Sequence, residues 1–194
     1  MNGPESEPWK ITERSVEVAQ SRAQMWTTFA SRALERSREA GPVPWGLVTE
    51  TWSCVVSINH VRNCAVLATA TATAESARAI AEVALSSFDE AVPRIKDARD
   101  FLEHNEAYVI GIGDLQQPGV SRSRRQVNEQ AASAWNFHPH FIDGDPDRPA
   151  VSVGPDIFVD LSGAVDQARL LTLGLYRAAA AQGLTPTSGA MRTT

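Results

Sequence analysis

The chain has 194 residues, which is enough for one domain with a buried core. Its apolar fraction of 43% is close to the globular average and excludes wholesale disorder. The formal net charge of −5 excludes a protein that coats nucleic acid through bulk positive charge, but it is compatible with a nuclease that has a small basic site.

The sequence shows no signal-peptide pattern and no apolar run of membrane-spanning length. We therefore expect a cytoplasmic protein without a membrane partner. The two cysteines, Cys54 and Cys64, lie in one expected helix, about 15 Å apart along its axis. Because this distance is beyond the reach of a disulfide, we interpret both as reduced core residues.

Residues 1–10 are polar and are expected to form a flexible N-terminus. A first helix is predicted from Thr12, its N-cap, to Ala40, and the Gly-Pro-Val-Pro sequence that follows ends it. A second helix is predicted over residues 45–72. It is apolar on more than one face, so we expect it to be the central helix.

A third helix is predicted over residues 75–88, and the junction before Pro93 separates it from a fourth. This fourth helix begins at Pro93, continues to Val109 and ends at Gly111. Four consecutive helices with short connections favour an antiparallel bundle, which we assign to residues 11–113.

Residues 114–183 are predicted to contain a surface loop, a β-hairpin or three-stranded sheet, and a final helix. Alternating apolar residues at Trp135, Phe137 and Phe141 indicate the first strand, and Asp160 or Ser162 is the expected N-cap of the last helix. Residues 184–194 are expected to form a flexible tail. The predicted fold class is therefore mainly α.

The fourth predicted helix carries polar residues opposite its apolar stripe, namely Arg99, Asp100, Glu103 and His104. Arg99 and His104 lie at the two edges of this arc, roughly 140° apart at about 100° per residue. An arginine can bind a phosphate and a histidine can transfer a proton near neutral pH.

The order Arg99-Asp100-Phe101-Leu102-Glu103-His104 resembles the motif of the HEPN family of all-helical ribonucleases, in which four to six residues separate an Arg from a His. The resemblance extends over residues 45–113. It implies a HEPN-like four-helix bundle, a homodimer with a shared cleft, and metal-independent RNA cleavage without a cofactor. His104 would be the general acid or base, Arg99 would hold the scissile phosphate, and Asp100 would orient the imidazole.

The same residues have a non-catalytic interpretation. Arg99 with Glu103, and Asp100 with His104, are spaced for ordinary i,i+4 pairs on a solvated helix face, each worth about 0.2–0.5 kcal/mol. Glu103 also places a carboxylate between the two motif residues, which would repel phosphate and neutralise Arg99. This feature is typical of a degenerate or regulated site.

Further polar residues are candidates for contacts with RNA. Arg122, Arg124 and Arg125 form the one basic cluster of the sequence and could follow an RNA backbone. Residues expected to line the cleft, or alternatively a buried network or dimer face, are His60, Arg62, Asn63 and Asn105.

His138 and His140 alternate on a predicted strand and so share one face. They could bind a metal such as zinc, but no cysteine follows and the nearby aspartates are those of a turn. We therefore favour a polar strand face and predict no metal site.

Two functions remain open at this point. The first is a HEPN-type endoribonuclease with an RNA substrate; many members of that family are toxins or defence effectors, which would imply a cognate antitoxin or regulator. The second is a non-catalytic dimeric module that binds a partner through the same surface. Catalysis needs Arg99 and His104 to converge in an open cleft, whereas a binding module does not.

Overall fold

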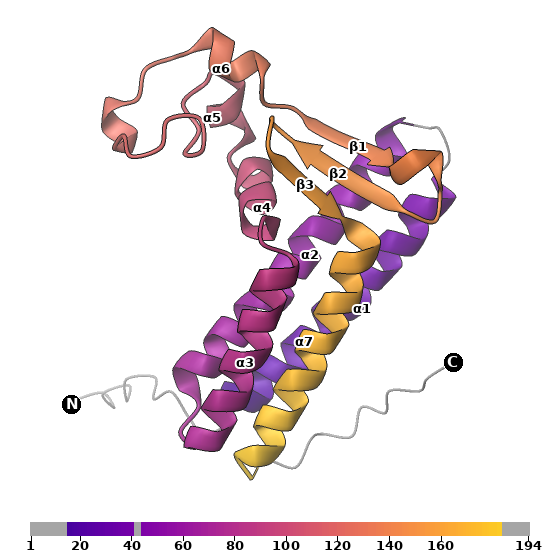
Figure 1. Cartoon of the computed structure of the whole chain (residues 1–194), viewed down its shortest axis with the longest axis vertical. Coiled ribbons are helices and arrows are strands. Elements are labelled where there is room, and N and C mark those ends of the chain that lie inside the picture. Colours follow the sequence, from indigo (N-terminus) through magenta and orange to yellow (C-terminus); the bar gives the residue numbers. More distant parts are fainter. Residues whose placement is uncertain (1–14, 41–43, 184–194) are drawn as a thin grey trace, which may run out of the picture.

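Four long helices form the body of the protein in a computed structural model that describes residues 15–40 and 44–183. They are antiparallel neighbours (Figure 1): α1 (Ser15–Glu39), α2 (Pro44–Thr71), α3 (Glu75–Ala91) and α7 (Leu161–Ala181). The prediction of a mainly α protein with a small sheet and a final helix is confirmed. Thr12 and the two termini that were expected to be flexible lie outside the described residues.

The tightest pairing in the bundle joins α1 to α2. The face of α1 toward the core consists mainly of small side chains, which allow the two backbones to approach closely. Those that are fully or almost fully buried include Ala19, Ala23, Ala30 and Ala33. The buried residues of α2 include larger ones, among them Val55, Ile58 and Val61.

The fourth helix of the bundle is α7, which packs against α1, α2 and α3. Its first turn is capped by Asp160, whose carboxylate accepts hydrogen bonds from the backbone N–H groups of Ser162 (3.0 Å) and Gly163 (3.2 Å). The helix expected in this position was the one that carries Arg99. That helix, Ile95–Glu103, is too short to extend along the bundle. The longer α7 packs in the fourth position instead and buries its apolar stripe there.

The helix predicted from Pro93 to Val109 is divided in two, and this prediction is wrong. α4 (Ile95–Glu103) ends where His104 adopts φ −120° and ψ 29°, and α5 (Asn105–Val109) follows. The break accompanies the burial of Tyr108, whose ring packs 4.9 Å from that of Phe101 and 5.2 Å from that of Trp135, measured between centroids. Packing of this aromatic cluster therefore overrides the local preference for one helix.

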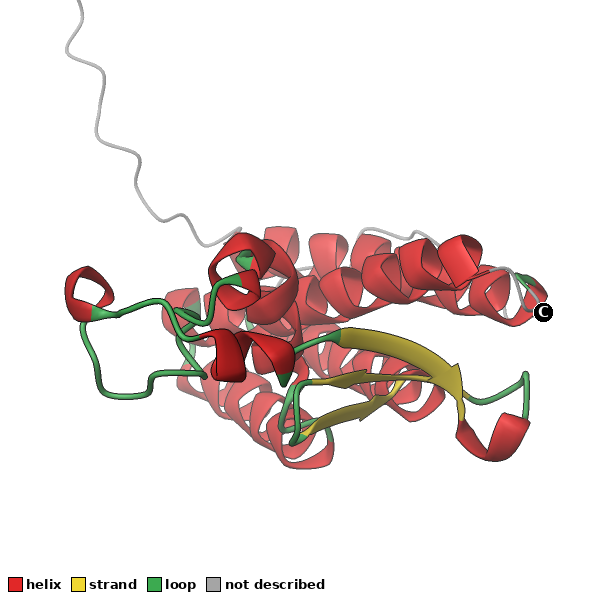
Figure 2. Cartoon of the chain, turned by 90° about the horizontal axis from the view of Figure 1, so that it is seen from above, coloured by secondary structure: helices red, strands yellow, loops and turns green. Residues whose placement is uncertain are grey.

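Residues 110–136 form an arm beside the sheet (Figure 2). The expected surface excursion contains a 3₁₀ turn, η1 (Arg122–Arg124), and a short helix that was not predicted, α6 (Glu129–Ser133). Gly111, at φ +78°, is required because a Cβ there would lie 2.0 Å from the carbonyl oxygen of Asn128. The loop between Gly111 and Asn128 is thus closed by contact between these two residues.

The three-stranded alternative predicted for the C-terminal part is confirmed. Strands β1 (Phe137–Phe141), β2 (Pro149–Val153) and β3 (Ile157–Asp160) form an antiparallel sheet in that order, with a 3₁₀ turn, η2 (Ile142–Gly144), after β1. In the register, Phe137 faces Val153 and Val153 faces Ile157. The buried side of the sheet covers the end of the bundle where α7 begins (Figure 1).

A single core joins the four bundle helices with α4, α5, β2 and β3. Its buried residues extend from Val16 in α1 to Ala179 in α7 and include Val151 and Val153 of the sheet. The boundary expected between residues 113 and 114 therefore does not divide the packing, because the C-terminal part supplies a helix of the bundle.

Candidate functional site

The side chain of Arg99 is bound by two carboxylates of its own helix. Its Nη1 donates to Asp100 Oδ1 at 2.8 Å, and its Nη2 pairs with Glu103 across one helical turn. The side chain is 26% exposed. Each terminal nitrogen of the guanidinium thus already has a carboxylate acceptor, whereas the buried Nε–H has no hydrogen-bond partner among the described residues.

His104 lies exposed at the break between α4 and α5. Its backbone N–H donates to Asp100 O at 3.1 Å and its carbonyl accepts from Ala107 N at 2.9 Å. The pKa of Asp114 is lowered, chiefly because Arg125 donates a hydrogen bond to its carboxylate. The charge of His104 makes the smallest contribution to this lowering. Among the described residues no hydrogen bond joins His104 to Arg99, whose terminal nitrogens pair with Asp100 and Glu103 instead.

The histidine whose pKa is affected by the charge of Arg99 is His60 of α2. Its imidazole stacks on Trp26 of α1, with ring centroids 4.2 Å apart and an interplanar angle of 18°. Burial and the positive charge of Arg99 lower the pKa of His60, while the negative charge of Glu103 opposes this shift. The imidazole is therefore held mainly neutral at pH 7.

Two further aromatic and apolar side chains continue this surface along α1. Phe29 packs edge-to-face on Trp26, with centroids 5.5 Å apart, and is 44% exposed. Met25 lies one turn before Phe29 and is 43% exposed. We call this surface the His60/Arg99 face; it consists of Met25, Trp26, Phe29, His60, Arg99 and Glu103.

The sequence did not identify Met25, Trp26 and Phe29 as site residues, because their spacing is that of a core stripe. A signal was nevertheless present. The apolar stripe of α1 is wider than one neighbouring helix can cover, since it includes Val18, Met25, Phe29 and Leu34. An apolar stripe of that width predicts that part of it faces solvent or a partner.

The other residues expected in a cleft are separated in the structure. Arg62 forms a bidentate pair with Asp89 of α3, with Nε–Oδ1 and Nη2–Oδ2 distances of 2.6 and 2.7 Å. This bond is also the main cause of the raised pKa of Arg62. Asn63 is exposed on α2, and Asn105 is exposed as the first residue of α5. Arg62 thus joins two helices, and the Nε–Nη2 edge of its guanidinium is occupied by Asp89.

The three arginines of the basic cluster divide into two kinds. Arg122 and Arg124 are exposed in η1. Arg125 donates to the carbonyls of Val120 (3.0 Å) and Ile112 (3.2 Å) and pairs with Asp114, so it holds the arm together.

The histidines of β1 lie on the outer side of the sheet. The rings of His138 and His140 are stacked with centroids 5.5 Å apart, and His140 Nδ1 lies 3.1 Å from the carbonyl oxygen of His138. In the part of the chain that the structure describes, no third His, Cys, Asp or Glu joins them in a metal-binding group. Phe158 instead lies 6.0 Å from His140, ring centroid to centroid.

Cys54 and Cys64 are free and buried. Burial raises the pKa of Cys54 to about 12 and that of Cys64 to about 11. Both thiols are therefore protonated and unreactive at neutral pH, as structural core cysteines are.

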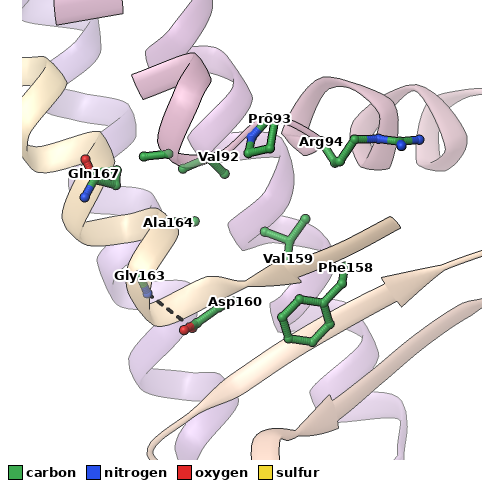
Figure 3. Close-up of a pocket in the computed structure, with 10 residues that line it drawn as sticks. Val92, Pro93, Arg94, Phe158, Val159, Asp160, Gly163, Ala164 and Gln167 are labelled. Atoms are coloured by element: carbon green, nitrogen blue, oxygen red, sulfur yellow. Dashed lines mark hydrogen bonds between the residues drawn. The ribbon is translucent and has the colours of Figure 1, made fainter. Parts of the chain in front are cut away.

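A pocket of ≈ 320 Å³ lies where the end of α3 and the start of α4 meet the sheet and the N-terminus of α7 (Figure 3). Its polar lining residues are Arg94, Asp160 and Gln167. Asp160 caps α7 and so already occupies the N–H groups that an anion would use. Because these N–H groups are occupied by the Asp160 carboxylate, they are not free to bind an anion in this pocket.

No protein-family model, curated protein or solved structure matched the chain in comparisons with each. Within the described residues, none of the helices is both long enough and apolar enough to cross a lipid bilayer. The arrangement in hand is thus a surface with an aromatic stack, a mainly neutral imidazole and a charge-balanced arginine.

Proposed function

We propose that this protein is a non-catalytic interaction module that binds a protein partner through the His60/Arg99 face. The pairing of Arg99 with both Asp100 and Glu103 is the observation that carries this proposal. A phosphate would have to compete with two carboxylates for the terminal nitrogens of Arg99 and would be repelled by their charge. A protein surface that supplies apolar side chains and a few hydrogen-bonding groups meets no such barrier.

The residue types on this face support a protein partner. Tryptophan, phenylalanine, methionine and arginine are enriched in the cores of protein interfaces, and tryptophan and arginine are frequent hot spots. The lowered pKa of His60 keeps the imidazole neutral, so covering it does not require burial of a full charge. The partner could equally be a regulator of the kind that the HEPN resemblance implies.

Site-specific photo-crosslinking in the native host tests this proposal. A photoreactive side chain at Phe29 is expected to capture one protein, and the same group at Asp156, an exposed residue after β2, is the control. Phe29→Ala is expected to weaken binding of the captured protein by about tenfold, because truncation of a partly exposed aromatic anchor typically costs more than 1 kcal/mol. Capture at both positions alike would show that the face is not specific.

A second candidate is a HEPN-type ribonuclease, which two observations favour: His104 is exposed, and His60 is within the electrostatic influence of Arg99. In that reaction the 2′-oxygen of RNA would form a bond to phosphorus while the bond to the 5′-oxygen breaks. A histidine would accept the 2′-OH proton and a proton would pass to the 5′-oxygen, leaving a 2′,3′-cyclic phosphate. Arg122 and Arg124 would then be candidates for contacts with the RNA backbone.

The two functions are separated by incubating a structured RNA pool with the protein in EDTA. The interaction module predicts no cleavage by wild type and none by Glu103→Gln, in which Arg99 has lost one carboxylate. Cleavage by wild type or Glu103→Gln that yields cyclic phosphate ends, and that disappears with His104→Ala or His60→Ala, would establish the ribonuclease and refute the first proposal.

A further inference from the structure

A second apolar surface lies on α3 and α7. It contains three large exposed side chains: Val83 is 67% exposed, Leu170 is 58% exposed and Leu173 is 40% exposed. They border a groove of ≈ 560 Å³ whose floor includes Ala84 and Gly174. We call this the α3/α7 face. It uses different helices from the His60/Arg99 face and does not depend on the function proposed for that face.

The groove exists because the two helices cross closely at small residues. A Cβ on Gly174 would lie 2.5 Å from the Cβ of Ala84. The larger side chains on either side of this crossing therefore stand up as ridges. Ridges beside a shallow groove are the shape into which another helix surface packs.

The outward stripe of α7 has a symmetric spacing. Asp166, Leu170, Leu173 and Arg177 follow one another at intervals of four, three and four residues, which is the spacing of a coiled-coil seam. The midpoint lies between Leu171 and Thr172. Read in either direction the stripe has the same spacing, so an antiparallel copy of α7 places Leu170 against Leu173 and Asp166 against Arg177.

The charges at the two ends of the stripe fit this pairing. Arg177 is exposed and makes no ion pair with any residue that the structure describes. Asp166 pairs at 2.8 Å with Arg169, and both side chains are at least half exposed, so this bond can be exchanged at little cost. Opposite charges at equal distances from one centre are what an isologous two-fold interface requires.

The exposed side of α3 carries small residues at the same height along the bundle as the midpoint of the α7 stripe. α3 and α7 are antiparallel, and the midpoint on α7 lies two and a half residues before Gly174 (Figure 1). The same level on α3 lies two and a half residues after Ala84, between Ser86 and Ser87. These small residues allow close approach of a second α3, with Val83 beside the aliphatic stem of the second copy's Glu90.

We infer that the α3/α7 face is a homodimer interface, in which a second copy packs antiparallel across a two-fold axis at the level of residues 171–172 of α7. The occupant is another copy of this chain, because one stripe supplies both halves of each apolar contact and both partners of each charge pair. Arg99 and His104 lie on neither stripe, so formation of this dimer does not bring the two motifs of the copies together.

The oligomeric state of the full chain is the first test, measured by sedimentation over a concentration series. The wild type is expected to be a dimer, and Leu170→Glu is expected to raise the dissociation constant at least about tenfold. Val109→Glu, a matched change at an exposed valine of α5, is expected to leave it unchanged. Circular dichroism checks that the variants fold. A monomeric wild type, or a dimer that Leu170→Glu does not weaken, would overturn the inference.

The register is tested by oxidative crosslinking of single-cysteine additions, since Cys54 and Cys64 are buried. In the antiparallel register residue 166 lies beside residue 177 of the other copy, whereas residues 166 of the two copies are about 16 Å apart along the axis. A mixture of Asp166→Cys and Arg177→Cys proteins is expected to form a disulfide dimer, and neither protein alone is expected to do so. Crosslinking of each variant with itself would refute the register. These outcomes are independent of RNA cleavage and of capture at Phe29.

Discussion

His60 is subject to opposite charges from two residues of one helix. Burial lowers its pKa most, Arg99 lowers it further, and Glu103 raises it. Because Arg99 and Glu103 also bind each other, the three side chains form one electrostatic unit on the His60/Arg99 face. This unit can be tested one charge at a time.

We predict shifts of opposite sign when the two charges are removed. His60 in the wild type should titrate below the ordinary histidine value of about 6.5. Arg99→Gln should raise its pKa, and Glu103→Gln should lower it further. NMR titration of the imidazole Cε1–H resonance measures these values, with Glu75→Gln at the start of α3 as the control. Shifts in the same direction in both variants would contradict the arrangement of these side chains.

The same shift determines how His60 affects stability. Its folded pKa is below its unfolded pKa, so between the two values the unfolded chain binds more protons. The contribution of neutral His60 to the free energy of unfolding is therefore fully present above the pKa of the unfolded chain. It is lost as the pH falls through the pKa of the folded protein.

At the residue scale, the sequence could predict local partners but not distant ones. The pairing of Arg99 with Glu103 follows from their spacing on a helix and is present in the structure. The electrostatic effect of Arg99 on His60 and the bond from Arg62 to Asp89 act between separate helices. Such contacts depend on how the helices pack, which the local pattern does not specify.

At the element scale, the helix ends that were predicted well are those marked by proline, glycine or a capping side chain. Asp160 caps α7, and α2 begins at Pro44. The break at His104 has no such mark, because neither proline nor glycine occurs between Ile95 and Val109. It is associated with the aromatic cluster around Tyr108, to which the arm contributes Trp135 from more than 25 positions further along the chain.

The crossing of α3 and α7 gives a prediction at this scale. Gly174→Ala should lower the free energy of unfolding by about 1–3 kcal/mol, because its Cβ would overlap that of Ala84. Adding Ala84→Gly should recover part of this loss, reduced by the helix propensity of glycine. Urea denaturation at one fixed protein concentration measures both.

Gly163→Ala provides the matched control, since a Cβ there makes only ordinary contact with Asp160. It should change the free energy of unfolding by no more than about 0.5 kcal/mol. Equal effects of Gly163→Ala and Gly174→Ala would mean that helix propensity, and not the close crossing, accounts for the result.

At the scale of the whole molecule, the largest difference from the sequence-based expectation is the origin of the fourth bundle helix. Sequence neighbours were assumed to be neighbours in space, which placed the bundle in residues 11–113. The structure closes the bundle with α7 and inserts α4, α5, the arm and the sheet between α3 and α7. The N-terminal part therefore depends on the C-terminal part for its core.

A buried hydrogen bond between α1 and α7 allows this dependence to be measured. Thr27 Oγ1 and Thr172 Oγ1 are 2.7 Å apart and join residues 145 positions apart in the sequence. Thr172→Val should lower the free energy of unfolding by about 1–3 kcal/mol, because it leaves the buried hydroxyl of Thr27 without this partner. Thr27→Val with Thr172→Val should be closer to the wild type than either single change, since the double variant buries no unpaired hydroxyl at this contact.

Thr28→Val, at an exposed position of α1, should change stability by no more than about 0.5 kcal/mol. If the effects of the two single changes simply added, α1 and α7 would not be in contact at this level, and a bundle closed by α7 would be wrong.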